Sequence, residues 1–495
     1  MKKTEGRGWL RNVVGAGALA LLAAGVFDLA SLIAAFTPRG EVTGSALVIA
    51  GQIRWGAGVA AAALVLRAFG LFRAGPIVKL RNLLSRGSTL RWVLGIFIVA
   101  LAVRLAYAAV AAAPPISDEQ YYHGLARSLA AGQGYTAGGT PVAYWPVGYP
   151  ALVAAFYAVL GSHYFPVILF QALLGAAAAA GLAWVGREFV SEGGARAAGL
   201  ILALWPNQFA YAARLFPAVV LAFAVVALAY LYTRGRKPWV TAAAAGLVNG
   251  VAALLAPVTL VLPAAALASD LFRRVGWLKV LGRVALLIFV AAVVAAPWAL
   301  RNWRLYGEFV GLSTNGGVNL WIGNNPNATG AYRYPTSRIN PLFVTEGELE
   351  RDRLGRELSW YFINHDREKF LMLALPKFVY TYGADISAFQ YDDLGRGVDP
   401  RVSARRWPSR LAQGYYALAV LGFILGLAAL RRRRRQGGWG EKLPLGTWLA
   451  WPVALTVVYL VFFGGGRFHF PMMAFVALLA GEAAASTREE RAATS

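Results

Sequence analysis

The sequence predicts an all-α polytopic membrane protein, and three observations support this fold class. The chain of 495 residues is 58% hydrophobic and only 15% charged, with a mean hydropathy of +0.52, which is too apolar for a soluble domain. Apolar runs long enough to span a bilayer recur along the whole chain. These runs are continuous rather than alternating, so they predict helices and not the strands of a membrane barrel.

Charge and cysteine content restrict the class of partner. The formal net charge is +24 and the chain has no cysteine, so disulfides and thiolate chemistry are excluded. The basic residues cluster in short loops between apolar runs, as in proteins that follow the positive-inside rule. We therefore expect a multi-pass protein of the plasma (cytoplasmic) membrane, and no nucleic-acid partner. The clusters assigned to the cytoplasm are 2–11, 73–91, 234–237, 273–283 and 431–435.

Residues 1–91 predict a two-helix membrane hairpin with spans at about 9–36 and 46–72. The apolar run after the basic N-terminus lacks a small-residue cleavage site, so we interpret it as an anchor and not as a signal peptide. Asp28 lies inside the first span, where an acid is a functional suspect by default. Since this hairpin precedes the rest of the membrane module, we favour a helix contact for Asp28.

Residues 92–299 predict the core membrane module. A helix over 92–113 runs outward and ends at Pro114-Pro115, and the following outer loop, 114–163, contains the short apolar piece "PVGYPALVAAFYAVLG". This piece is too short to span, so we expect a juxtamembrane helix. Further spans are predicted at about 164–186, 193–210, 216–232, 238–255, 258–270 and 281–299.

The C-terminal part divides at about residue 412. Residues 300–412 contain no long apolar run and are rich in turn signals and charges, which indicates an extracytoplasmic loop region with a helix over "EGELERDRLGRELSWYFINH". Residues 413–495 predict three more spans, at about 413–430, 444–463 and 468–484, and a cytoplasmic tail. The total is about twelve transmembrane helices.

The stretch "ISDEQYYHGLARSLAAGQGY" opens the outer loop and can be explained by helix chemistry alone. Ser117 and Gln120 form the pattern of a capping box. Asp118 and Glu119 then occupy a first helical turn, where acids complement the helix dipole. In the predicted topology, however, both acids face the outside together with arginines from distant loops. Carboxylates can deprotonate a hydroxyl and guanidinium groups bind phosphate, so these residues suit chemistry on a lipid-borne anionic substrate.

The order of several stretches resembles a known superfamily. These are "SDEQYYHGLARSLAAGQGY", "WPNQFAYAARLF", "GLVNGVAALLAPVTLVLP", "PWALRNWRLYGEFVGLSTNGGVNLWIGNNPNATG" and "RFHFPMMAFVALLAG". Together they resemble the GT-C membrane glycosyltransferases, in particular the bacterial branch related to protein O-mannosyltransferases (glycosyltransferase family 39) and lipid A aminoarabinose transferases. The resemblance covers about residues 92–484, so the first two helices are an addition to that pattern.

The resemblance implies an inverting glycosyl transfer from a polyprenyl-phosphate sugar donor to an extracytoplasmic lipid, glycan or protein acceptor. It implies that Asp118 is the general base, with Glu119 as helper, and that the two acids could hold a divalent metal cation; no other cofactor is implied. By location we add candidates for donor-phosphate or substrate binding: Arg214, Arg301, Lys377, Arg467, His469 and, as a sugar platform, Tyr149. The chain departs from the family at Pro217 and Ala256, where relatives often carry Glu and Arg, which would fit a different acceptor or a poorly active paralogue.

Two alternatives follow from the same pattern. A ligase or polymerase of polyprenyl-linked glycans would also need a large outer loop with a base and arginines. A lipid or glycan transporter would place polar residues near mid-bilayer on broken, repeated helices, whereas here the predicted spans are mostly uninterrupted and the polar groups lie outside.

Overall fold

The computed structural model describes residues 44–68, 79, 82–111, 114–234, 237–333, 342, 345–435 and 443–485. The predicted first span over 9–36, with Asp28, lies outside these residues. The described part is built from helices and one short hairpin of strands β1 (Thr136–Ala137) and β2 (Thr140–Pro141), in which Ala137 faces Thr140. The predicted all-α polytopic membrane fold is confirmed.

Six helices of the described residues are long and apolar enough to cross a membrane, and several shorter apolar helices accompany them. The long helices are α3 (Gly44–Ala68), α5 (Thr89–Val110), α8 (Phe165–Val185), α12 (Pro238–Leu255), α14 (Trp277–Tyr306) and α22 (Trp407–Arg435). The shorter ones are α7 (Gly148–Leu160), α11 (Ala218–Arg234), α13 (Leu262–Phe272), α23 (Leu445–Val461) and α24 (Met473–Ala485). Single 3₁₀ turns occur at Gly186–Glu188, Pro257–Val261 and Phe470–Met472.

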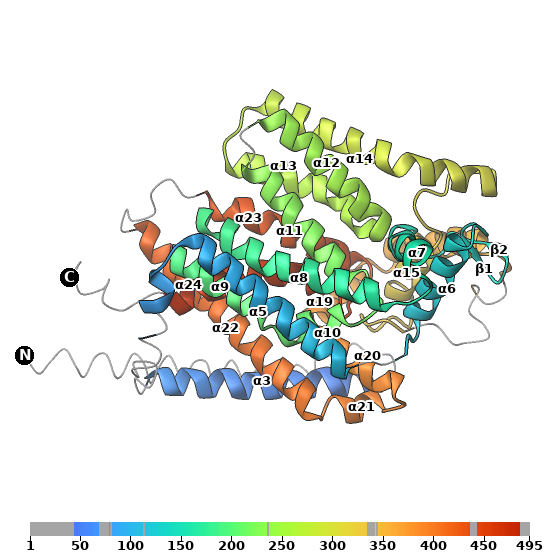
Figure 1. The fold of residues 1–495 in the computed structure, drawn as a ribbon. Helices are drawn as coiled ribbons and strands as arrows, with labels where there is room; N and C mark the ends of the chain where they lie inside the picture. Colours follow the sequence, from blue (N-terminus) through green and yellow to red (C-terminus); the bar gives the residue numbers. More distant parts are fainter. Residues whose placement is uncertain are drawn as a thin grey trace, which may run out of the picture.

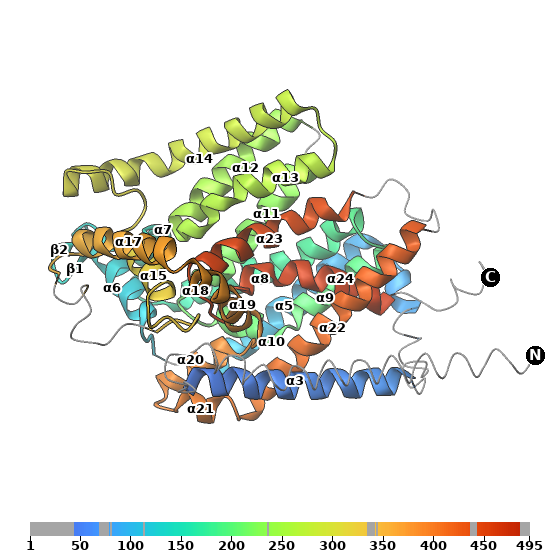
Figure 2. The ribbon, with the colours of Figure 1, turned by 180° about the vertical axis from the view of Figure 1, so that it is seen from behind.

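The helices of the described residues form one bundle, and different elements lie at its two ends (Figures 1 and 2). Helices α12, α13 and α14 form a layer that packs on α11, while α3 lies along the opposite side against α22. The largest buried apolar cluster joins α8, α9, α11, α23 and α24 in the middle. Helix α6 (Asp118–Ala130), the β1–β2 hairpin and α7 gather at one end of the bundle, beside α15 (Gly316–Gly323). This end carries the predicted outer loop.

The predicted span over 193–210 is wrong as a continuous helix. It consists of α9 (Glu192–Ala203) and α10 (Pro206–Ala212), and Trp205 between them is extended, with ψ 115°. A residue that precedes proline avoids the helical region, and a proline nitrogen cannot donate to the preceding turn. At 12 residues, α9 is about 18 Å long, which is shorter than the roughly 30 Å hydrocarbon core.

Residues 300–412 are more helical than predicted. The predicted helix over 346–365 is confirmed as α17, and short helices fill much of the remaining described region: α15 (Gly316–Gly323), α17 (Glu348–His365), α18 (Arg367–Met372), α19 (Ala374–Tyr382), α20 (Ser387–Gly395) and α21 (Pro400–Ser403). Helices α15 and α17 approach closely because Gly317 meets the Asp352 backbone, where a Cβ atom would overlap it. The Asn315-Gly316-Gly317 sequence, which suggested a turn, instead begins α15, with Asn315 at the N-cap position.

Candidate active site at the outer-loop end of the bundle

The backbone is strained where α6 begins. Ser117 has φ 50° and ψ −127°, and the only other non-glycine residue of the described chain with a positive φ is Arg274. The predicted capping box is wrong, because the Ser117 side chain makes no cap hydrogen bond. Instead, the Glu119 carboxylate accepts from the backbone N–H of Ile116 at 3.0 Å. Such a backbone conformation costs about 1–3 kcal/mol and persists only where surrounding contacts enforce it.

Glu119 and Arg214 form a buried ion pair that contains two hydrogen bonds between the side chains. The Glu119 side chain is 1% exposed and that of Arg214 is 2% exposed. Arg214 Nε donates to Glu119 Oε1 at 2.7 Å, and a terminal guanidinium nitrogen donates to Oε2. Burial raises the pKa of Glu119, and the attraction of Arg214 opposes that rise. Parallel bonds of this kind fix the orientation of both side chains as well as stabilising them.

Two more residues extend this pair into a network. Arg214 Nη1 donates to Asp392 Oδ1 at 3.0 Å, and the Tyr107 hydroxyl donates to the other oxygen of Asp392. The network therefore joins α5, the start of α6, the turn after α10, and α20. Burial raises the pKa of Asp392, while Tyr107 and Arg214 act in the opposite direction.

Asp118, the residue before Glu119, forms a different and more accessible ion pair. Arg467 Nη1 donates to Asp118 Oδ2 at 2.9 Å, and the two side chains are 30% and 31% exposed. The same nitrogen donates to the Tyr391 hydroxyl at 3.2 Å. Burial lowers the pKa of Arg467, but neighbouring Tyr391 and Asp118 outweigh this effect and hold its pKa above the usual value. Arg467 is therefore a permanent cation beside an accessible carboxylate.

Glycines place Arg467 at this point. The segment "GGGRFHFP" follows α23, and Gly464 N donates to the Gly330 carbonyl at 2.8 Å in a parallel bridge with Ala331. A Cβ atom on Gly464 would overlap the Lys377 carbonyl oxygen. A glycine is needed there because the two backbones are in direct contact.

His469 lies two residues beyond Arg467 but inside the protein. Its side chain is 0% exposed, with Nδ1 2.5 Å from the Thr381 carbonyl oxygen and Nε2 2.9 Å from Asp385 Oδ1. Asp385 also accepts from Trp205 Nε1 at 2.5 Å and from Asn207. Since a carbonyl oxygen only accepts, Nδ1 carries a proton. The contact with Asp385 therefore needs one further proton, on Nε2 or on the carboxyl group.

Three other predicted residues have internal partners. Lys377 is 0% exposed; its Nζ donates to Asn324 Oδ1 at 2.8 Å and to the Val461 carbonyl at 3.0 Å, and burial lowers its pKa to about 7. The buried Tyr149 hydroxyl donates to Gln171 Oε1 at 3.0 Å. Arg301 donates to the carbonyl groups of Val142 and Tyr135 at 2.8 and 3.2 Å and so ties α14 to the β1–β2 hairpin. Their predicted contacts with substrate stay predictions.

The structure thus brings together Asp118, Glu119, Arg214 and Arg467 and adds residues that the sequence did not single out. These are Tyr107, Tyr391 and Asp392. The available signal was the "YDD" triplet inside the outer region 300–412, where adjacent acids are unusual beside aromatic residues. The contact of Asp392 with Arg214 depends on tertiary packing.

The two acids as they lie do not form a ligand set for a divalent cation. Both Glu119 oxygens are bound by Arg214, one of them also by a backbone N–H, and Asp118 faces Arg467. Two guanidinium groups would repel a metal ion at this place. Within the described ranges, no group of three or more His, Cys, Asp and Glu side chains is placed to hold a metal.

Comparisons with known proteins give only distant likenesses. No family model and no curated protein matches the chain. Among solved structures, the chain is similar to the oligosaccharyltransferase AglB from Archaeoglobus fulgidus, in complex with an inhibitory peptide and a dolichol-phosphate, with 13% identity and a TM-score of 0.46 over 79% of this chain. It is similar to ArnT from Cupriavidus metallidurans bound to undecaprenyl phosphate, with 15% identity and a TM-score of 0.42 over 80% of this chain.

The chain spans 50% of the length of the archaeal enzyme and 78% of ArnT. Likenesses at these TM-scores carry no argument about activity or about individual residues.

Proposed function

We propose that this protein is a membrane glycosyltransferase of the GT-C type, which transfers a sugar from a polyprenyl-phosphate carrier to a hydroxyl-bearing acceptor. The observation that carries the proposal is the juxtaposition of an accessible carboxylate and a permanent cation, Asp118 and Arg467, at 2.9 Å. A proton acceptor and a phosphate-binding group are the two devices that this transfer needs.

In the proposed step, the acceptor hydroxyl oxygen attacks the anomeric carbon while the bond from that carbon to the phosphate oxygen breaks. The hydroxyl proton passes to the Asp118 carboxylate, and the bonding electron pair leaves with the polyprenyl phosphate. Attack opposite the leaving group inverts the anomeric configuration. Asp118 is the candidate for this role because its side chain is 30% exposed, whereas the Glu119 carboxylate is buried and fully bonded.

Arg467 would receive the charge that develops on the leaving phosphate. Its guanidinium group has five N–H donors in a planar fork that matches phosphate oxygens, and only Nη1 is used in the contacts with Asp118 and Tyr391. A phosphate that binds Arg467 would compete with the Asp118–Arg467 ion pair and leave the Asp118 carboxylate oxygen available to the acceptor hydroxyl. Binding of the donor phosphate at Arg467 would thus prepare the Asp118 carboxylate to act as the base.

The remaining buried residues are positioning residues in this proposal. Glu119 follows Asp118 on the first turn of α6, and its two bonds to Arg214 fix the direction of that turn. Asp392 and Tyr107 hold Arg214 from the other side. A base held within a narrow range of angles loses little entropy on reaching the transition state.

The donor class, the acceptor and the membrane face come from the sequence. The resemblance implies a polyprenyl-phosphate donor and a lipid, cell-surface glycan or protein acceptor. The distribution of basic loops favours a plasma-membrane protein with its site on the extracytoplasmic face. An assay with a panel of polyprenyl-phosphate sugars would distinguish a hexosyl donor from a pentosyl donor.

The test is to identify the released carrier. Purified protein in detergent is incubated with a panel of radiolabelled polyprenyl-phosphate sugars and with cell-envelope fractions as acceptors, and the products are separated by chromatography. We expect free polyprenyl monophosphate in equal amount to the transferred sugar. No release from these donors, together with transfer from an added polyprenyl-pyrophosphate-linked glycan and release of polyprenyl pyrophosphate, would indicate a glycan ligase or polymerase. Movement of intact donor, without cleavage, across the membrane of vesicles that contain the protein would indicate a transporter. Either result would overturn the proposal.

A further inference from the structure

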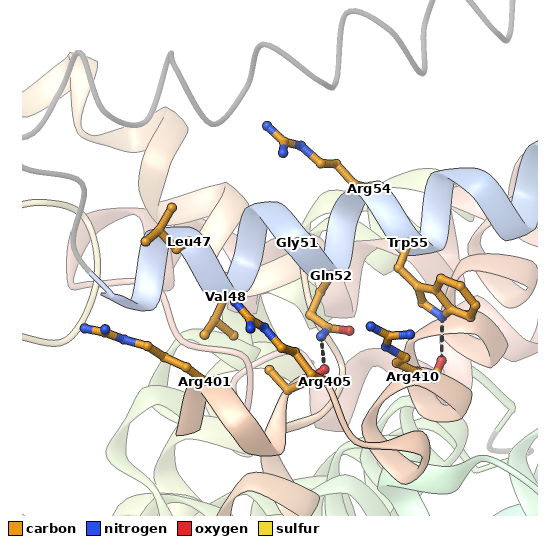
Figure 3. Close-up of a pocket in the computed structure, with 10 residues that line it drawn as sticks. Leu47, Val48, Gly51, Gln52, Arg54, Trp55, Arg401, Arg405 and Arg410 are labelled. Carbon is orange, nitrogen blue, oxygen red and sulfur yellow. Dashed lines mark hydrogen bonds between the residues drawn. The ribbon is translucent and has the colours of Figure 1, made fainter. Parts of the chain in front are cut away.

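A second polar site lies between α3 and the segment of α21 and α22. It is a cavity of about 590 Å³, and Figure 3 shows the side chains that line it. Helix α3 contributes its first three turns, and the other wall comes from α21 and the start of α22. The lining residues are Leu47, Val48, Gly51, Gln52, Arg54, Trp55, Arg401, Ala404, Arg405 and Arg410. None of these belongs to the Asp118–Arg467 site.

The cavity is lined by four arginines and no acid. Among the residues that the structure describes, no ion pair joins Arg401, Arg405 or Arg410 to a carboxylate. The nearest acid in sequence, Asp399, accepts at 2.7 Å from the backbone N–H of Arg401 and caps α21. Guanidinium groups gathered without acids repel one another, and an anion relieves that repulsion.

Two hydrogen bonds between helices give the cavity a fixed shape. Gln52 Nε2 donates to the Ala404 carbonyl at 2.6 Å, and Trp55 Nε1 donates to the Arg410 carbonyl at 2.8 Å (Figure 3). The Arg410 guanidinium also lies over the Trp55 ring, 5.4 Å from its centroid. The arginines on the second wall are thus attached to a preorganised frame.

The surroundings of the cavity are those of a membrane surface. It lies near the N-terminal end of α3, a helix long and apolar enough to span, at the end of the bundle where α20 and α21 also lie. Leu47 is 56% exposed and Trp55 37% exposed. Tryptophan and arginine side chains are typical of the headgroup level of a membrane.

We propose that this cavity binds the phosphate headgroup of an anionic lipid, with the phosphate between the arginines of α21 and α22. The apolar chain of the lipid follows the apolar face of α3. The lipid then bridges the N-terminal hairpin to the core module. The lipid is either a bilayer phospholipid or a polyprenyl monophosphate, since both carry a phosphate on an apolar chain.

The test compares lipid retention by wild type and two double variants. Arg401→Gln with Arg405→Gln removes two charges from the cavity. Arg304→Gln with Arg333→Gln is the matched control, because it removes two exposed arginines that lie outside the cavity. Each protein is exchanged into detergent with phosphatidylglycerol, phosphatidylcholine, undecaprenyl phosphate or inorganic phosphate, and bound lipid is counted by native mass spectrometry.

We expect wild type and control to retain phosphatidylglycerol or undecaprenyl phosphate but not phosphatidylcholine, and the cavity variant to bind about tenfold more weakly, as for the loss of one or two charge-assisted contacts. The lipid retained preferentially identifies the source. Retention of phosphatidylcholine equal to that of phosphatidylglycerol, or equal retention by the cavity variant and the control, would overturn the proposal. So would displacement of the lipid by millimolar inorganic phosphate, because a lipid site also depends on the chain.

Discussion

Glu119 and Arg214 form a buried two-point ion pair one residue away from Asp118, which is accessible and pairs with a different arginine. Two adjacent acids therefore lie in two environments. The buried acid is fully bonded and holds the helix start in place, whereas the accessible acid has a partner that a substrate phosphate could attract. Within the proposed function, this division favours Asp118 as the base and Glu119 as a positioning residue.

Asp118→Asn should reduce sugar transfer by about 10²–10⁴-fold, because an amide cannot accept the hydroxyl proton. The protein should still insert and elute as wild type in size-exclusion chromatography, since Asp118 is partly exposed. Glu357→Gln, an exposed acid on α17, is the matched control and should keep full activity. Near-normal turnover by Asp118→Asn would remove the base assignment.

Arg467→Lys should lower kcat by about 10²-fold, because the charge remains but the planar fork of donors is lost. Arg467→Gln should lose more, since the charge is lost as well. Steady-state kinetics with purified donor would measure both. Equal activities of the lysine variant and wild type would show that Arg467 acts only as a point charge or not at all.

Glu119→Gln should destabilise the protein by about 2 kcal/mol, because the buried Arg214 would keep only Asp392 as an anionic partner. Thermal denaturation in detergent would measure the change. Glu308→Gln removes an exposed ion pair with Arg353 and should cost less than about 0.5 kcal/mol. If both variants melt alike, the buried network does not support the fold as described.

Lys377 should make stability depend on pH. Burial lowers its pKa from 10.5 to about 7 in the folded protein, so between these values the unfolded chain binds more protons and stability rises with pH. Below about pH 7 both states are protonated and this contribution is constant. Lys377→Met should flatten the rise in melting temperature between pH 7 and 10, whereas Lys369→Met, which removes an exposed lysine, should not. A rise that persists in Lys377→Met must come from other groups.

Ser117→Ala should change stability by less than about 0.5 kcal/mol, because the Ser117 hydroxyl caps nothing. Ser191, by contrast, accepts from Gly194 N at 3.1 Å and donates to Glu482, so Ser191→Ala should cost about 1 kcal/mol or more. Melting curves of the two variants, recorded side by side, would check the contrast. A large loss at Ser117 would restore the capping interpretation.

The sequence predicted the helical membrane fold because apolar run length and continuity depend on local composition. Helix α7 was also predicted, since its 13 residues are apolar but too few to span. The break at Trp205–Pro206 was missed because the apolar character continues through it, although Pro206 was a local signal. Apart from α17, the helices of residues 300–412 were missed because short helices stabilised by tertiary contacts have little periodicity of their own.

For the site, the sequence could identify residue types but not pairings. It selected Asp118, Glu119, Arg214 and Arg467, yet nothing local shows that Arg214 pairs with Glu119 and not with Asp118. The cap at Ser117 was wrong because its backbone has φ 50° and ψ −127°, whereas a residue that caps a helix with its side chain is typically in the β region. The contacts of Asp392 and Tyr391 with the two arginines depend on how α20 packs against the rest of the protein, which only the folded chain defines.

The ion pair between Asp118 and Arg467 joins residues 349 positions apart. During synthesis, α6 leaves the ribosome long before the segment after α23 has been made. The Asp118 carboxylate therefore lacks the Arg467 guanidinium until that segment has been synthesised and inserted. A chain that stops before Arg467 would have every other element of the site and no catalytic pair. Enzymatic competence would thus be linked to completion of translation, and incompletely made chains in the membrane would be unable to consume the carrier.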